Sequence, residues 1–98
     1  MGTVNISYWQ SLAQAGDGSD AQVAIGMELS ENVTSGATSA QSTAATSDTR
    51  IARIATDTTV RVLIDNDPTA VAGSVRLLAD TVEYFGIQPG EKVAVIDE

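Results

Sequence analysis

The 98-residue sequence contains no cysteine and no histidine. Without cysteine there is no disulfide, no thiolate nucleophile and no cysteine-based metal site. Without histidine the usual general base and the commonest metal ligand are both missing, and no ordinary Ser-His-Asp arrangement can form. No apolar run approaches the ~18 residues that a membrane-spanning helix needs. We therefore expect a protein that is not an enzyme, uses no cofactor and does not cross a membrane.

Basic residues are also scarce, because five Lys and Arg face thirteen Asp and Glu, for a net charge of −8. So few cations cannot neutralise many phosphates, which argues against nucleic-acid binding. The same balance disfavours anionic membranes. An acidic surface keeps a protein soluble and could also suit a basic partner. The segment Met1–Tyr8 has no positive charge, so it does not resemble a secretory signal, and synthesis in a cytoplasm is expected.

Aromatic residues number only four, whereas Val and Ile together account for seventeen residues. The β-branched bias favours strands. A small chain with so few large side chains builds a thin core, and oligomerisation is a natural way to bury more surface. We expect an all-β fold, a small jelly-roll-like sandwich or barrel of short antiparallel strands with an extended N-terminal arm.

Period-two patterns and turn residues divide the chain. Val60, Val62 and Ile64 alternate with polar neighbours, as in a strand with one buried face. Asp65–Pro68 and Gln88–Glu91 are turns, the second with Pro and Gly in the type II arrangement. Gly26 falls within an expected strand and indicates a bulge or a close backbone approach. The expected strands are 4–8, 22–29, 50–55, 59–64, 74–79, 81–87 and 92–96.

Composition suggests three parts: residues 1–33 with the N-terminal arm and strands, residues 34–49 as a linker or extended loop, and residues 50–98 as the β module. In the middle part nine of sixteen residues are Ser or Thr and nothing apolar exceeds alanine. Such a segment buries too little surface to order itself. We expect it to be disordered when free, although an arm of this composition could become ordered on a partner.

Chemistry-bearing motifs are weak throughout. Asp17–Asp20 with Glu28 resembles part of a calcium loop, but Ala21 and Gln22 stand where a ligand and a glycine are needed. A solvated turn is the simpler interpretation, as it is for Asp65 and Asp67. We therefore predict no metal site.

Interface candidates come from the large and the cationic side chains. Trp9 either caps the domain's own core or docks on a neighbouring subunit, since aromatic residues are favoured at interface centres. Arg61 and Arg76 should lie opposite the core and pair with carboxylates on adjacent strands or across an interface. Alternation sends Tyr84 and Phe85 to opposite faces. The candidates are Ile6, Tyr8, Trp9, Leu12, Arg61, Arg76, Tyr84 and Phe85.

The second half of the chain carries a recognisable order of segments. Asp67–Ala70 precedes Leu77–Ala79, then Val82–Phe85, and finally Pro89–Gly90 ahead of the strand 92–96. This order, with the Ser/Thr/Ala stretch before it, resembles small virion structural proteins of tailed bacteriophages, of the capsid decoration or cement type.

The resemblance implies a function. Such proteins bind the major capsid protein on the outer surface of the virion and associate with themselves, often as trimers, so a homo-oligomer with a trimer favoured is expected. Two alternatives stay open: a tail, neck or fibre component of the particle, and a small ligand- or carbohydrate-binding β module. Exposed aromatic residues on one sheet face would support the carbohydrate binder.

Overall fold

The computed structural model describes residues 2–14 and 20–98, of which 12–14 and 20–25 are described by their backbone alone. The described chain is all-β, which confirms the predicted fold class. No helix in this part of the chain is long and apolar enough to cross a membrane. The strands are β1 (Thr3–Gln14), β2 (Asp20–Thr34), β3 (Ala40–Gln41), β4 (Ile51–Thr56), β5 (Val60–Asp65), β6 (Val75–Leu77), β7 (Thr81–Gly86) and β8 (Lys92–Asp97).

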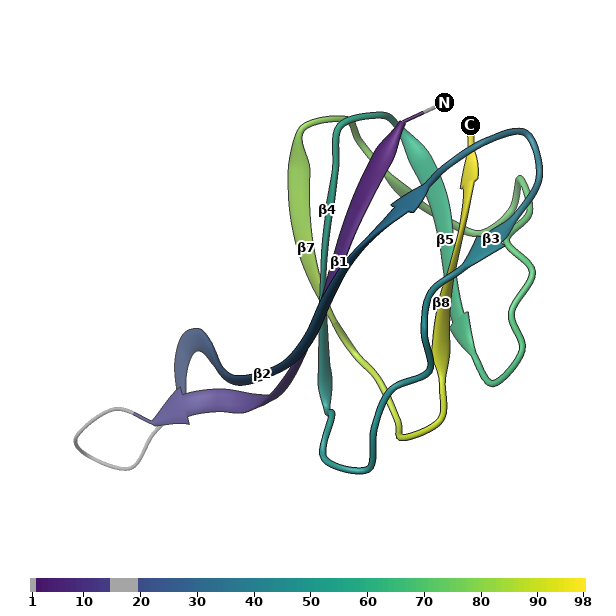
Figure 1. The fold of residues 1–98 in the computed structure, drawn as a ribbon. Coiled ribbons are helices and arrows are strands. Elements are labelled where there is room, and N and C mark those ends of the chain that lie inside the picture. The colour runs from purple at the N-terminus through teal and green to yellow at the C-terminus, as the bar shows by residue number, and fades with distance from the viewer. Residues whose placement is uncertain (1, 15–19) are drawn as a thin grey trace.

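Two four-stranded antiparallel sheets pack face to face as a sandwich (Figure 1). The first sheet has the order β2-β1-β4-β7 and the second the order β3-β8-β5-β6. Each sheet therefore combines strands from both halves of the chain. β1 in particular is an inner strand of the first sheet, between β2 and β4, so the strand predicted at 4–8 is confirmed and residues 3–9 do not form an extended arm.

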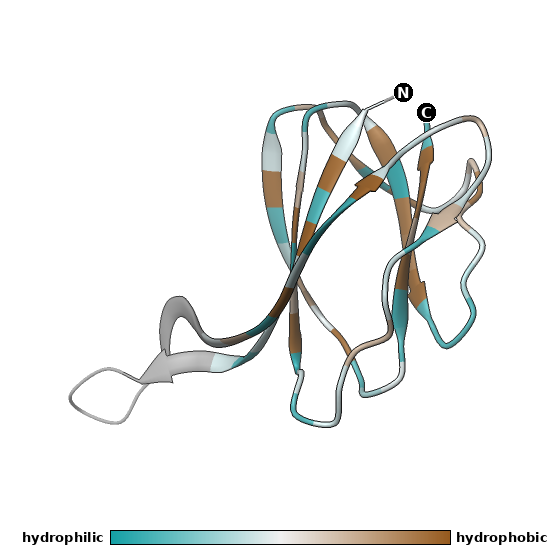
Figure 2. Ribbon diagram, viewed as in Figure 1, coloured by the Kyte–Doolittle hydropathy of each residue, from teal (hydrophilic) through white to brown (hydrophobic). Residues whose placement is uncertain are grey.

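The core lies between the two sheets because alternate residues of each strand point inward. On the first sheet Ile6 pairs with Ile54 and Tyr8 with Ala52, and all four side chains are fully buried. Figure 2 shows apolar and polar residues following one another along the strands. The buried apolar residues that form the core cluster are Val4, Ile6, Tyr8, Val33, Ala45, Ala52, Ile54, Val60, Val62, Leu77, Ile87, Val93 and Val95.

Beyond Trp9, β1 pairs only with β2, and the two strands leave the sandwich together (Figure 1). We call residues 10–14 and 20–26 the hairpin arm. It makes the molecule long, with principal extents of 46 × 26 × 22 Å. Near its base the pairing slips by one residue, between Tyr8 opposite Leu29 and Trp9 opposite Met27, so the extra residue is Glu28 and not Gly26. Gly26 itself has φ +72° and shows the close approach that was the other prediction for it. A Cβ on Gly26 would lie 2.6 Å from Gln10 Oε1, which explains the glycine.

The prediction that the Ser/Thr-rich stretch 34–49 is disordered when free is wrong, because this stretch is an ordered crossover between the sheets. β3 pairs with β8, and the Ser42 N–H donates to Val93 O at 2.8 Å. The Val93 N–H in turn donates to Ser42 Oγ at 2.8 Å. Small hydroxyl side chains such as Ser42 and Thr49 fit into buried positions where they satisfy polar groups. Low apolar content therefore did not prevent order here.

Candidate interaction surfaces

The outer face of the first sheet carries two aromatic residues, the half-buried Trp9 and the exposed Tyr84. Tyr8 and Ala52 point into the core, so alternation directs their neighbours Trp9 and Ile51 outward. Cross-strand pairing joins Met27, Trp9, Ile51 and Gly86 in one outward row and Ser30, Ser7, Arg53 and Tyr84 in the next. We call the outward residues Trp9, Met27, Ile51, Arg53, Val82 and Tyr84 the aromatic face.

Trp9 is held against this face by a hydrogen bond. Its indole Nε1–H donates to Ser7 Oγ at 2.9 Å. Ser7 points outward yet is only 3% exposed, which contact with the indole explains. The bond draws the ring from its own row toward the row of Arg53 and Tyr84. Trp9 therefore does not cap the core, which was the first alternative for it, and docking on a neighbouring subunit stays a prediction.

The prediction that Tyr8 and Ile6 are interface residues is wrong, because both side chains are completely buried within the chain. The Tyr8 hydroxyl donates to Thr43 O at 2.5 Å and lies 2.7 Å from Ser42 Oγ, so it ties β1 to the crossover. Burial raises the pKa of the Tyr8 phenol; the Ser42 hydrogen bond opposes the rise and the Glu31 carboxylate adds to it. These contacts give Tyr8 a role in holding the two sheets together.

The outer face of the second sheet, by contrast, is partly covered by the loop 66–74. Val93, Ala94 and Val95 of β8 are all fully buried, so β8 is covered on both faces. The Gln41 side chain, which lies beside Ala94, donates to Pro68 O at 2.7 Å and to Asp67 Oδ1 at 3.0 Å. These bonds hold the loop across the sheet.

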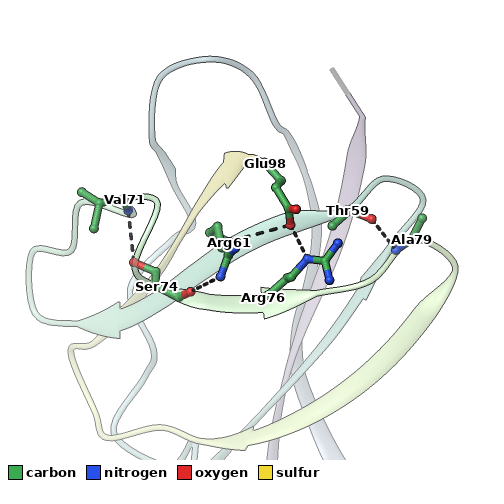
Figure 3. A network of polar contacts seen from close by, with 7 residues as sticks. All are labelled: Thr59, Arg61, Val71, Ser74, Arg76, Ala79 and Glu98. Atoms are coloured by element: carbon green, nitrogen blue, oxygen red, sulfur yellow. Dashed lines mark hydrogen bonds and ion pairs between the residues drawn. The ribbon is translucent and has the colours of Figure 1, made fainter.

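Arg61 and Arg76 lie directly opposite each other on β5 and β6, next to Glu98 (Figure 3). Glu98 pairs with Arg76 through a short contact and with Arg61 at 3.8 Å. The Arg61 guanidinium also donates to Ser74 O at 3.2 Å. The hydrogen bond from Arg76 holds the pKa of the Glu98 carboxyl below its usual value, against a small rise from desolvation. Both arginines therefore have a partner within their own chain, the first of the two pairings that the sequence analysis considered.

β7 is the edge of the first sheet and carries apolar side chains. Tyr84 is 51% and Val82 45% exposed. Next to it, at the open side of the sandwich, lies an apolar pocket of about 140 Å³ lined by Val62, Leu63, Ile64, Val75 and Phe85. Phe85 packs partly against the core, whereas Tyr84 points outward, so the prediction that they occupy opposite faces is confirmed.

Of the eight predicted interface residues, Trp9 and Tyr84 lie together on the outer face of the first sheet, and Arg61 and Arg76 lie together on the outer face of the second. Leu12 has its side chain outside the described residues. Met27, Arg53 and Val82 share the aromatic face but were not singled out. Val82 could have been found from the sequence, because it lies two residues from Tyr84 and so on the same face of one strand. Met27 and Arg53 reach this surface through pairing with other strands, opposite Trp9 and Tyr84, which the sequence does not show.

The calcium-like motif falls largely outside the described residues, since 17–19 are among those not described. Within residues 2–14 and 20–98, no group of three or more acidic side chains is arranged to hold a metal ion. Asp65 caps its own turn by accepting the Asn66 N–H at 2.8 Å, as the turn interpretation predicted.

No protein-family model, curated protein or solved structure matches this chain.

Proposed function

We propose that this chain is a structural protein of a bacteriophage particle that binds the major capsid protein at the outer surface of the capsid and associates with itself. The observation that carries the proposal is the asymmetry of the sandwich. The first sheet presents an aromatic face and extends into the hairpin arm, while the second sheet is partly covered by its own loop. A sheet face next to a projecting arm is suited to lying on a large surface and reaching a neighbouring subunit.

The chemistry of the aromatic face fits a protein partner. Tryptophan, tyrosine and arginine are the residues that most often dominate binding energy at interfaces. In the two outward rows described above, Arg53 is the one charged residue, although the whole chain carries thirteen carboxylates. A face without carboxylates can approach an acidic or neutral surface without like-charge repulsion.

Electron microscopy of labelled particles tests the location. The chain carrying a small tag is added to particles that lack it, and the label is imaged. A decoration protein gives label repeated over the whole shell. Label confined to the tail, neck or fibres favours the alternative role in the same kind of particle, and absence of label contradicts both.

Surface variants test the mode of attachment. Truncation of residues 1–12 is unsuitable, because it would remove β1 from the middle of the first sheet. We instead expect Trp9→Ala to weaken particle binding at least about tenfold, as loss of an interface anchor does. Leu63→Ala, on the outer face of the second sheet, is the matched control and should bind normally. Equal binding by the wild type and both variants would contradict the proposed face.

A carbohydrate-binding module is the second candidate, because the structure places Trp9 and Tyr84 on one sheet face. Exposed aromatic rings on a flat sheet can stack against sugar rings. Affinity electrophoresis in gels containing soluble polysaccharides checks this function. Retardation that is lost in Trp9→Ala and in Tyr84→Ala would favour it over capsid binding.

A further inference from the structure

The open edge of β7 has the features of a strand that pairs with another chain. Its six residues keep an unbroken register with β4, from Ile51 opposite Gly86 to Thr56 opposite Thr81. It contains no proline, lysine or register shift, and its one charged residue is Glu83, which lies opposite the inward-pointing Ile54. The other edges of the sandwich differ. β3 and β6 have two and three residues, and the long edge strand β2 is interrupted by a register shift between its pairings with Tyr8 and with Trp9.

The direction of the β7 backbone groups follows from the ladder. The Ile87 N–H donates to Arg50 O at 3.0 Å, so odd-numbered residues here point their backbone groups toward β4. In an antiparallel ladder the intervening residues point theirs the other way. The N–H and C=O groups of Val82, Tyr84 and Gly86 therefore face the open edge.

We propose that β7 pairs antiparallel with β7 of a second copy of this chain, about a two-fold axis through Tyr84, to form a continuous eight-stranded sheet. The proposal rests on the self-association part of the proposed function and is independent of capsid binding. In this register Tyr84 lies opposite the second copy's Tyr84, and Val82 lies opposite Gly86. All three outward-facing backbone positions then find partners.

Charge selects this register over its neighbour. A continuous sheet needs residues of the same face opposite each other, and the two axes that pair five of the six β7 residues in this way pass through Tyr84 or through Glu83. An axis through Glu83 would set two carboxylates directly opposite, which is destabilising. With the axis through Tyr84, each Glu83 lies opposite Phe85.

A second copy fits this edge for two further reasons. The residues whose backbone groups face the edge, Val82, Tyr84 and Gly86, are uncharged, and this register keeps the Glu83 carboxylates of two chains of net charge −8 on the diagonal, about 7–8 Å apart, instead of directly opposite. The apolar pocket beside the edge is lined in part by Val75, which is 55% exposed. Pairing at β7 brings neighbouring chain to this opening and reduces the water contact of its apolar lining.

Cysteine trapping tests the register, because the chain has no cysteine of its own. Tyr84→Cys puts two Cα atoms about 5.5 Å apart, within the range that a disulfide spans. Glu83→Cys is the matched control, since its diagonal separation of about 7–8 Å exceeds that range. Under mild oxidation we expect covalent dimers from Tyr84→Cys and few from Glu83→Cys. The reverse pattern, or none from either, overturns the proposal.

Light scattering after size-exclusion chromatography tests the assembly itself. The wild type should have twice the mass of one chain. Tyr84→Pro removes one outward N–H without breaking the ladder to β4, and we expect dimerisation at least about tenfold weaker. Tyr84→Ala, which keeps that N–H, should weaken it less, and circular dichroism verifies that each variant is folded. A monomeric or trimeric wild type, or a dimer unaffected by Tyr84→Pro, overturns the proposal, whereas particle binding by a monomer would leave the capsid-binding part of the proposed function standing.

Discussion

The two outer faces of the sandwich differ more than the two inner faces do. Both inner faces are lined by buried aliphatic residues that meet in one core. Outside, the first sheet presents Trp9 and Tyr84, while the second is crossed by the loop that Gln41 holds. The inner faces are alike because both must exclude water. The outer faces are under no such common requirement, so their difference indicates where the molecule contacts something else.

The largest expected effect comes from truncating a side chain in the core. An outward-facing side chain of the same strand serves as the comparison. Ile54→Ala creates a cavity between the sheets and should lower the free energy of unfolding by about 2–5 kcal/mol. Ile51→Ala, on the same strand but facing outward, should cost about 1 kcal/mol or less. Urea denaturation measures both. Equal losses would mean that the outer face of the first sheet is packed like the core.

Removing the tie between β1 and the crossover should have an intermediate effect. Tyr8→Phe deletes the hydroxyl that bonds to Thr43 O and Ser42 Oγ, and should cost about 1–2 kcal/mol. Tyr84→Phe is the control on the outer face and should change stability by less than about 0.5 kcal/mol. Similar values for the two tyrosines in urea denaturation would contradict the different roles assigned to them.

Tyr8 also predicts how stability depends on alkaline pH. Because burial raises its pKa above the ordinary value of 10.0, its contribution is complete below pH 10.0 and is lost as pH rises through the folded-state pKa. The free energy of unfolding should therefore fall above pH 10, and more steeply in the wild type than in Tyr8→Phe. Urea denaturation at a series of alkaline pH values measures the slope. Identical slopes would count against this assignment.

Uncovering the second sheet should have a smaller effect. Gln41→Ala removes both bonds to the loop 66–74 and should cost about 1 kcal/mol. Amide hydrogen exchange should accelerate in this loop while the core strands stay protected. Gln88→Ala, in an exposed turn, is the control. Unchanged exchange in the loop would show that other contacts hold it.

The smallest expected effect concerns the charges in Figure 3. Because Arg76 lowers the pKa of Glu98 below 4.5, the contribution of this carboxylate is present above that pH and is lost as pH falls through the lowered value. Glu98→Gln should leave the two positive charges of Arg61 and Arg76 next to each other without a carboxylate between them. The variant should therefore melt at a slightly lower temperature than the wild type at neutral pH and low salt. Its melting temperature should also fall less than that of the wild type when the pH is lowered. High salt should narrow the difference. A larger difference at high salt would contradict the ion-pair explanation.

Local features of the fold were predictable because their causes are local. The alternation of Val60 and Val62 and the Pro89–Gly90 turn needed only neighbouring residues. Gly90 has φ +86°, and the Glu91 N–H donates to Gln88 O at 3.1 Å, as the type II turn requires. The second-half strands all lie within a few residues of their predicted positions.

Strand neighbours were not predictable from these patterns, and the candidate surface depends on them. Alternation places Trp9 and Tyr84 on some outer face but does not say that β1 and β7 share a sheet. The error at residues 34–49 has a related cause. Ser42 is ordered by Val93, fifty-one residues away, and composition holds no information about so distant a partner.

Each sheet takes strands from both halves of the chain, and this affects how the chain folds. β1 needs β4, and the crossover strand β3 needs β8, the last strand to be made. The hairpin of β1 and β2 can close early, but neither layer is complete until the final third of the chain has arrived. Such distant contacts slow two-state folding to roughly milliseconds to seconds. During synthesis, the groups on β3 that pair with β8 therefore stay unpaired until β8 has been made.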